Sequence, residues 1–387
     1  MTDSYTIQQR VEQRCNILLT GLGNVQKVLG VDVEGVLRKE DSEQFDARRQ
    51  LLRVEKQAIR DKELNEKSEQ SYVDSIRDMV HENLLEQFKE RLQDKDTIFY
   101  KILGYDDGLT ALLDALTVRA SSISKIEPLA AEVPWLYDDL IKMINQPKYR
   151  KTDARGKVVT VESLRVALSF LGMENLKLVV PAMAFRRWIP QITDPYPDIK
   201  SRLWECALAT ALSCRKIAEH SKVDPGQAFT LGLFHELGKL VVTRLYFRLF
   251  DEVQRAALIE AHNDRKREEH TALTKIEPSA DYLIFLLESF AAQISAELIT
   301  RMGFKRLFIA TAIHEYAERK PLAQCSPMAR VLHQGIAYAR YRILKGHKLI
   351  TMDEAKEYLR EVAMPSGALS ALKATDLRSL NLTFDEN

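Results

Sequence analysis

Apolar residues recur along most of this chain at the three- and four-residue steps of an amphipathic helix. The clearest run lies in 70–92, where one face carries Tyr72, Val73, Ile76, Val80, Leu84, Phe88 and Leu92. The same spacing predicts further helices at 1–38, 135–145, 161–171, 174–188, 204–221, 227–246, 283–302, 306–318, 326–344 and 352–362. No segment alternates long enough to build a sheet. The pattern therefore predicts an all-α fold.

Glycine, proline and charged runs divide the helical pattern into three parts. The run Gly104–Gly108 predicts a boundary, and Gly172 suits the residue that ends a helix. We expect an N-terminal helical region over 1–105, a helical core over 107–345, and a short helical extension with a tail over 346–387. The charge-dense stretch 41–68 has an apolar stripe too short to establish a coiled coil. A hairpin, a docking surface or a homodimer through the N-terminal region all remain open.

Composition fits a globular protein of more than one structural unit. The chain has 387 residues, with 45% apolar and 29% charged. A net charge of +1 excludes a nucleic-acid binder held by bulk charge, although a local basic patch stays open. The scattered cysteines Cys15, Cys206, Cys214 and Cys325 form no C-x-x-C pair. No signal-peptide pattern and no run of about 18 apolar residues is visible. We expect a cytoplasmic protein with no membrane span.

One stretch carries chemical information, the run from Gly232 to Leu240. It reads Gly-Leu-Phe-His-Glu-Leu-Gly-Lys-Leu and places His235 directly before Glu236. A histidine next to a carboxylate offers two adjacent ligands for a divalent metal, which can activate water and polarise a phosphoryl oxygen. The following Gly238 permits a close approach of backbone to another helix.

This run resembles the HD superfamily signature, which usually reads Gly-Leu-Leu-His-Asp-Ile-Gly-Lys-Leu. Four other segments resemble parts of the HDOD subgroup. They are 140–147, which ends in Asn-Gln-Pro; 161–172, which ends in Leu-Gly; Leu203-Trp204, about 31 residues before His235; and 310–314. The resemblance covers roughly 107–345. It implies an all-α fold and a role in bacterial signal transduction, often beside cyclic-di-GMP, chemotaxis or two-component modules.

The chain departs from that family at most positions that hold metal. The departures are Cys206 for the first histidine, Glu236 for the aspartate of the pair, Ala291-Ala292-Gln293 where relatives carry a histidine, Glu315 after His314, and Tyr338 for the late aspartate. Metal sites tolerate few missing ligands. We therefore expect no catalytic residue, metal or cofactor. The weak metal candidates are His235, Glu236 and His314. The structural alternative is a hydrogen-bonded His235 with Glu236 paired to Lys239 or an arginine.

Other candidates carry less information. Arg186 and Arg187, beside Trp188, form a candidate phosphate-binding or nucleotide-binding pair, with a solvated basic face as the alternative. His314 and His333 lie 19 residues apart, a spacing without motif value. His81 stands between charged neighbours and is expected at the surface.

The sequence thus favours a non-catalytic HDOD-type signalling or scaffold module. Its expected partner is a protein of a signalling pathway, with a cyclic nucleotide or a guanosine nucleotide as a further option. The alternative is a metal-dependent phosphohydrolase or phosphodiesterase that uses His235 and Glu236 with a divalent ion. Metal binding distinguishes the two, because only the enzyme requires it.

Overall fold

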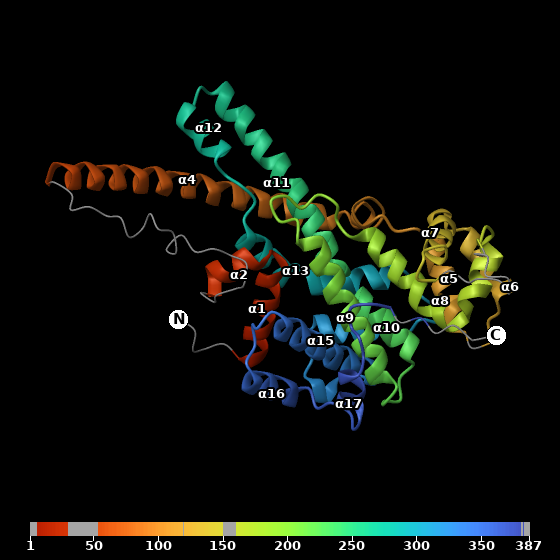
Figure 1. The fold of residues 1–387 in the computed structure, drawn as a ribbon. Helices are drawn as coiled ribbons and strands as arrows, with labels where there is room; N and C mark the ends of the chain where they lie inside the picture. The colour runs from red at the N-terminus through yellow and green to blue at the C-terminus, as the bar shows by residue number, and fades with distance from the viewer. Residues whose placement is uncertain (1–5, 30–52, 119, 150–159, 381, 383–387) are drawn as a thin grey trace.

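The computed structural model describes residues 6–29, 53–118, 120–149, 160–380 and 382. Within these residues the chain is helical and contains no strand, which confirms the all-α prediction (Figure 1). The expected helix ends within 30–52 and the loop at 151–157 lie outside the described residues.

The N-terminal residues build part of the core. α1 (Ile7–Leu19) begins with a capping box between Thr6 and Gln9, and α2 (Leu22–Leu29) follows after a break. The break falls at Gly21, whose φ of 111° favours glycine, so the single helix expected from residue 1 is wrong at this point. α1 packs against α9, α13, α15 and α16, and its buried side chains join the main core.

A long helix, α4 (Arg53–Gln93), extends beyond the body of the protein (Figure 1). Its described apolar face buries Val73, Val80, Leu84 and Phe88, and the helix packs on α11 and α12. A π-helix, η2 (Thr97–Leu103), links it to the next helices and ends at Gly104, whose φ is 79°.

A group of helices gathers at the opposite end from the tip of α4 (Figure 1). Its members are α5 (Gly108–Thr117), α6 (Ile123–Ala131), α7 (Pro134–Ile144) and α8 (Leu164–Trp188). α8 bends at Gly172, whose φ is 70°. This is the glycine at which the sequence predicts one helix to end and another to begin. The first half starts at Leu164, because Ser163 caps it.

The central helices are α9 (Ile199–Ala218), α10 (Pro225–Phe234) and α11 (Leu237–Asn263). They are followed by α12 (Arg267–Thr274), α13 (Ala280–Arg301), α14 (Ala310–Ala317), η3 (Leu322–Gln324), α15 (Pro327–Gly346), α16 (Met352–Glu361) and α17 (Ala368–Lys373). Glycines let these helices approach closely. A Cβ on Gly232 would lie 2.6 Å from the Cα of Ala211 on α9.

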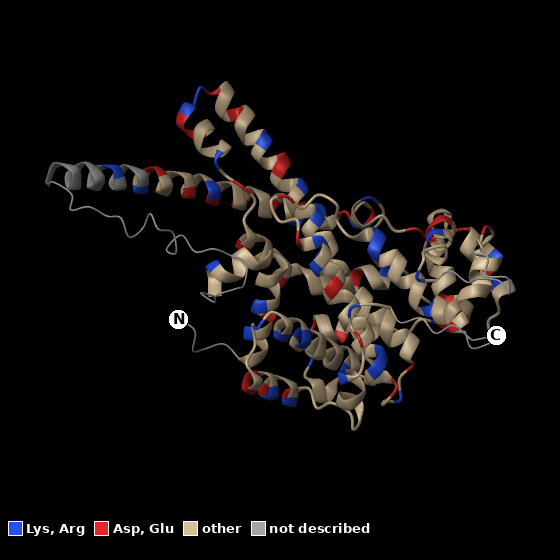
Figure 2. Ribbon diagram, in the orientation of Figure 1, with Lys and Arg blue, Asp and Glu red and all other residues tan. Residues whose placement is uncertain are grey.

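Two helices, Leu164–Trp188 and Ala280–Arg301, are long and apolar enough to cross a membrane by length and composition. In each helix 56% of the apolar window is buried inside the protein, as in the core helices of soluble proteins. Figure 2 shows positive and negative residues mixed along α4, α11 and α16, so neither sign dominates these helices.

Candidate functional site

The His235-Glu236 pair lies where two helices meet. The expected single helix over 227–246 is wrong here, because α10 ends at Phe234 and α11 begins at Leu237. Hydrogen bonds at the junction span three residues, from Glu236 N–H to Leu233 and from Lys239 N–H to Glu236. These tighter bonds turn both side chains of the pair inward, where the side chain of His235 is 3% and that of Glu236 5% exposed.

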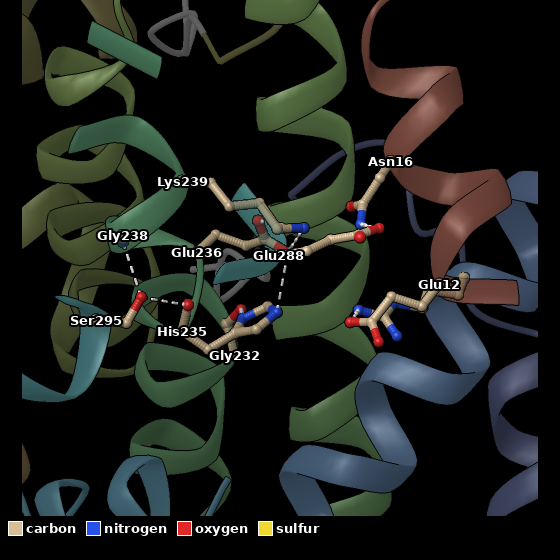
Figure 3. A network of polar contacts seen from close by, with 10 residues as sticks. Glu12, Asn16, Gly232, His235, Glu236, Gly238, Lys239, Glu288 and Ser295 are labelled. Atoms are coloured by element: carbon tan, nitrogen blue, oxygen red, sulfur yellow. Dashed lines mark hydrogen bonds and ion pairs between the residues drawn. The ribbon is translucent and has the colours of Figure 1, made fainter. Parts of the chain in front are cut away.

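A serine from α13 fixes the backbone of this junction. The Ser295 hydroxyl donates to the carbonyl oxygen of His235 at 2.7 Å and accepts the N–H of Gly238 at 2.8 Å (Figure 3). Gly238 has no Cβ, and a Cβ there would lie 2.7 Å from the carbonyl carbon of Ala291. Close packing of α11 on α13 therefore depends on the glycine and places the serine within reach of both backbone groups.

The side chains of His235 and Glu236 bind protein groups. Nδ1 of His235 lies 2.7 Å from the carbonyl oxygen of Gly232, so Nδ1 carries the proton that it donates. Nε2 lies 3.1 Å from Oε1 of Glu236. Lys239 Nζ is 3.0 Å from both Oε1 and Oε2, and its hydrogen bond goes to Oε1. The structural alternative for Glu236, pairing with Lys239, is the arrangement that the structure shows.

Burial and charge act in opposite directions on this cluster. Burial alone raises the pKa of Glu236, but the nearby Lys239 ammonium and the His235 ring outweigh it and lower that pKa. Burial lowers the pKa of Lys239, yet the Glu236 carboxylate more than compensates and raises it. Glu236 and Lys239 are therefore both ionised at neutral pH and attract each other in a largely buried environment.

The residues around the pair do not fit a divalent metal. Both nitrogens of His235 and Oε1 of Glu236 have protein partners, whereas Oε2 of Glu236 lies within ion-pair distance of Lys239 but accepts no hydrogen bond among the described residues. Burial raises the pKa of the Cys206 thiol, which keeps it protonated and a poor ligand for a hard ion. Tyr338, in the place of the late aspartate, accepts a hydrogen bond from Arg342 at 3.1 Å. The described residues contain no group of three His, Cys, Asp or Glu side chains placed to hold a metal ion.

A cavity of about 360 Å³ adjoins His235 and Glu236. Helices α1, α13, α14, α15 and α16 contribute to its wall. Arg340 of α15 donates to Glu12 of α1 at 3.0 Å. Asn16 of α1 donates to Glu288 of α13 at 3.0 Å (Figure 3). These contacts fix α1 along one side of the cavity. Sequence reasoning missed all four residues.

The structure separates the two candidate histidines. His333 lines the same cavity as His235, and the ring of Tyr316 lies between them, with centroids 5.3 and 6.2 Å away. Nε2 of His333 is buried without a hydrogen-bond partner among the described residues, and burial lowers its pKa. His314 instead lies in another pocket, 2.7 Å from Thr300 Oγ1. It is not placed beside Glu236.

Two further sequence expectations meet different outcomes. Arg186 and Arg187 are exposed at the end of α8 and line a second cavity, described below. His81 is not a free surface residue: its ring stacks on Tyr282 with centroids 3.9 Å apart, and burial lowers its pKa to about 4. Its position between charged neighbours in the sequence gave no indication of this partner on α13.

The family comparison agrees with the helical framework. Residues 106–282 match the HDOD domain. No curated protein matches the chain. A solved structure described as a putative phosphohydrolase from Shewanella amazonensis is 17% identical, with a TM-score of 0.46, and the match covers 73% of this chain and 94% of that one.

Two other solved structures are similar at the same low level. A putative metal-dependent phosphohydrolase from Shewanella amazonensis is 14% identical, with a TM-score of 0.47 and coverage of 78% of this chain and 95% of that one. The MmoQ response regulator from Methylococcus capsulatus is 19% identical, with a TM-score of 0.31 and coverage of 70% and 97%.

Proposed function

We propose that this chain, which carries an HDOD domain over residues 106–282, is a non-catalytic signalling module of the bacterial cytoplasm that binds a protein partner. One observation carries the proposal. His235 and Glu236, which stand where the family has its central metal-ligand pair, are engaged by protein groups. Nδ1 of His235 contacts the carbonyl oxygen of Gly232, Nε2 of His235 lies 3.1 Å from Oε1 of Glu236, and Lys239 Nζ lies 3.0 Å from both oxygens of Glu236.

The energetics of this set favour a structural role. Lys239 supplies the positive charge that the buried Glu236 carboxylate requires. A metal at Glu236 would displace the Lys239 ammonium from its partner, and an uncompensated buried charge costs several kcal/mol. Since Cys206 and Tyr338 offer no anionic oxygen or free imidazole, little binding energy is available to offset that cost.

The position of α1 supports the same reading. Arg14 forms a bidentate pair with Glu354 of α16, at 3.0 and 2.9 Å, which adds to the Glu12–Arg340 and Asn16–Glu288 contacts. Helix α1 is thus bound to α13, α15 and α16 along the rim of the cavity. A retained helical core with a fixed wall suits a binding module better than an open catalytic site.

A second candidate function is a metal-dependent phosphohydrolase. The cavity of about 360 Å³ favours it, because His235, Glu236 and the unpartnered Nε2 of His333 share that cavity with the cationic side chain of Arg340. This candidate requires Lys239 to leave Glu236 and an ion to take its place.

Metal content measured by mass spectrometry tests the proposal. The full chain is dialysed, loaded in turn with Mn²⁺, Mg²⁺, Fe²⁺ and Zn²⁺, and assayed for hydrolysis of bis-p-nitrophenyl phosphate. We expect no stoichiometric ion and no metal-dependent hydrolysis. His262→Ala is the matched control for His235→Ala, since His262 is exposed at the end of α11. One ion per chain that is lost in His235→Ala and kept in His262→Ala would refute the proposal.

A further inference from the structure

A second cavity, of about 560 Å³, lies between α7, α8, α9 and the segment 378–380. We call it the basic groove. The charged side chains among the described residues that line it are Asp139, Lys142, Lys148, Arg186, Arg187 and Arg378. Five are positive and one is negative, which contrasts with the mixed charges of the cavity beside His235. Such a local excess attracts anions strongly even in a chain of net charge +1.

The floor of the basic groove is apolar. Val179 and Ala182 of α8 and Leu208 of α9 are buried beneath it, and Met183 and Trp204 are half-buried. An apolar floor with a positive rim suits a ligand that has one aromatic part and one anionic part. Ligand sites of this size combine an apolar lining with a few placed polar groups.

Aromatic rings position the two arginines. The guanidinium of Arg186 lies 5.3 Å from the ring centroid of Trp204, and that of Arg187 lies 5.1 Å from the ring centroid of Trp135. Asp139 adds an ion pair to Arg187 at 3.4 Å. Stacking restrains a guanidinium while its edge remains able to donate to oxygen, and this planar fork matches phosphate. The arginines are therefore partly organised before any ligand arrives.

We propose that the basic groove binds a nucleotide that carries two or more phosphates. The phosphates lie between Arg186, Arg187 and Lys142, and the base lies on the apolar floor beside Trp204. A phosphate group carries at most about two negative charges, so five positive groups against one negative group match at least two phosphates. An acidic peptide would use the positive rim but would leave the apolar and aromatic floor largely unused.

The basic groove is separate from the His235 site. Trp204 lines the groove, whereas Cys206 lines a small cavity with Glu236 and Lys239. Residues two apart on a helix point about 200° from each other, so the two sites lie on different faces of α9. The inference goes beyond the proposed function, and its outcome does not depend on whether His235 binds a metal.

Isothermal titration calorimetry on the full chain tests the inference with GTP, ATP, cyclic di-GMP, AMP and poly-glutamate. We expect saturable binding of at least one ligand with two or more phosphates, weakened by added salt, and at least about tenfold weaker binding of AMP. Arg186→Gln and Arg187→Gln should each weaken binding about tenfold or more, because each removes a charge-assisted hydrogen bond. The matched control is Arg255→Gln, an exposed arginine of α11 outside the groove, which should bind as the unmodified chain does.

Three results would overturn the inference. The first is the absence of saturable binding for all four nucleotides. The second is nucleotide binding that Arg186→Gln and Arg187→Gln leave unchanged. The third is binding of poly-glutamate alone, which would assign the groove to an acidic peptide. Lys142→Gln should also weaken nucleotide binding, because it removes one of the positive charges placed around the phosphates. Lys142 is exposed, so this change leaves the core packing intact.

Discussion

Replacement of Gly238 by alanine tests the packing that builds the His235 site. The added methyl would overlap the carbonyl oxygen of Ala291, and it would lie 2.7 Å from the carbonyl carbon of Ala291 and 2.9 Å from Ser295 Oγ, where ordinary contacts are 3.4–4 Å. Its nearest neighbour is backbone and cannot rotate away. α11 and α13 must therefore move apart, which disturbs the Ser295 bonds to His235 and Gly238.

The expected loss follows from two contributions. Overpacking of a well-packed core costs about 1–3 kcal/mol, and each of the two Ser295 hydrogen bonds contributes about 1 kcal/mol. We therefore expect Gly238→Ala to lower the free energy of unfolding by about 3–5 kcal/mol. With an m-value of about 3 kcal/mol/M, this corresponds to a urea midpoint lower by about 1 M or more.

Urea unfolding followed by far-UV circular dichroism measures this loss. The matched control is Gly346→Ala in the last turn of α15, where the new methyl would meet no described atom within 4 Å other than those of adjacent residues and of its own helix backbone. That control should be neutral or more stable by up to about 1 kcal/mol, since alanine favours helix over glycine. A loss below about 1 kcal/mol in Gly238→Ala would refute the close approach of α11 to α13.

The remaining predictions concern buried charge. Glu236→Gln leaves the Lys239 ammonium without its counter-charge and should lower the free energy of unfolding in urea by about 3–5 kcal/mol. The double variant with Lys239→Met should recover part of that loss. Additive losses in the two single variants and the double variant would contradict a structural ion pair. Folded His81 has its pKa lowered by burial from 6.5 to about 4, so unfolding takes up a proton between these values and stability falls as pH drops from 6.5 towards 4. His81→Phe keeps the stacking on Tyr282 but does not titrate, so its urea midpoint should fall less between pH 7 and pH 5 than that of the unmodified chain. An equal fall in both would show that His81 is not the group responsible.

Local pattern was sufficient to predict much of the fold. Helical spacing located α13, α15 and α16 to within a few residues, because apolar periodicity is a property of neighbouring positions. It also located the end of α4, but not its start at Arg53, because the stretch 41–68 was treated as separate from the helix over 70–92. The sequence correctly predicted a helix boundary at Gly172. This residue lies at the bend of α8, and its φ of 70° favours glycine. The break between α10 and α11 was not predicted from the sequence. His235 and Glu236 both keep helical backbone angles there, and the change is in the spacing of the hydrogen bonds.

The candidate site was only partly predictable for a similar reason. The pairing of Glu236 with Lys239 is a three-residue step on one helix, which sequence can suggest. The contacts of α1 with the cavity join residues several hundred positions apart, and no local signal marks them. His314 was favoured over His333 because it lies in the more family-like segment, yet only His333 lines the cavity beside His235.

The incorporation of α1 into the core has a consequence for synthesis on the ribosome. Glu12 finds its partner Arg340 only after 328 further residues are made, which at about 5–20 residues per second takes roughly 15 to 65 s. During that interval the apolar face of α1, including Val11 and Leu18, lacks the α15 surface that covers it. The nascent chain therefore exposes an amphipathic helix for most of its elongation, and this helix is the segment where chaperone contact is expected first.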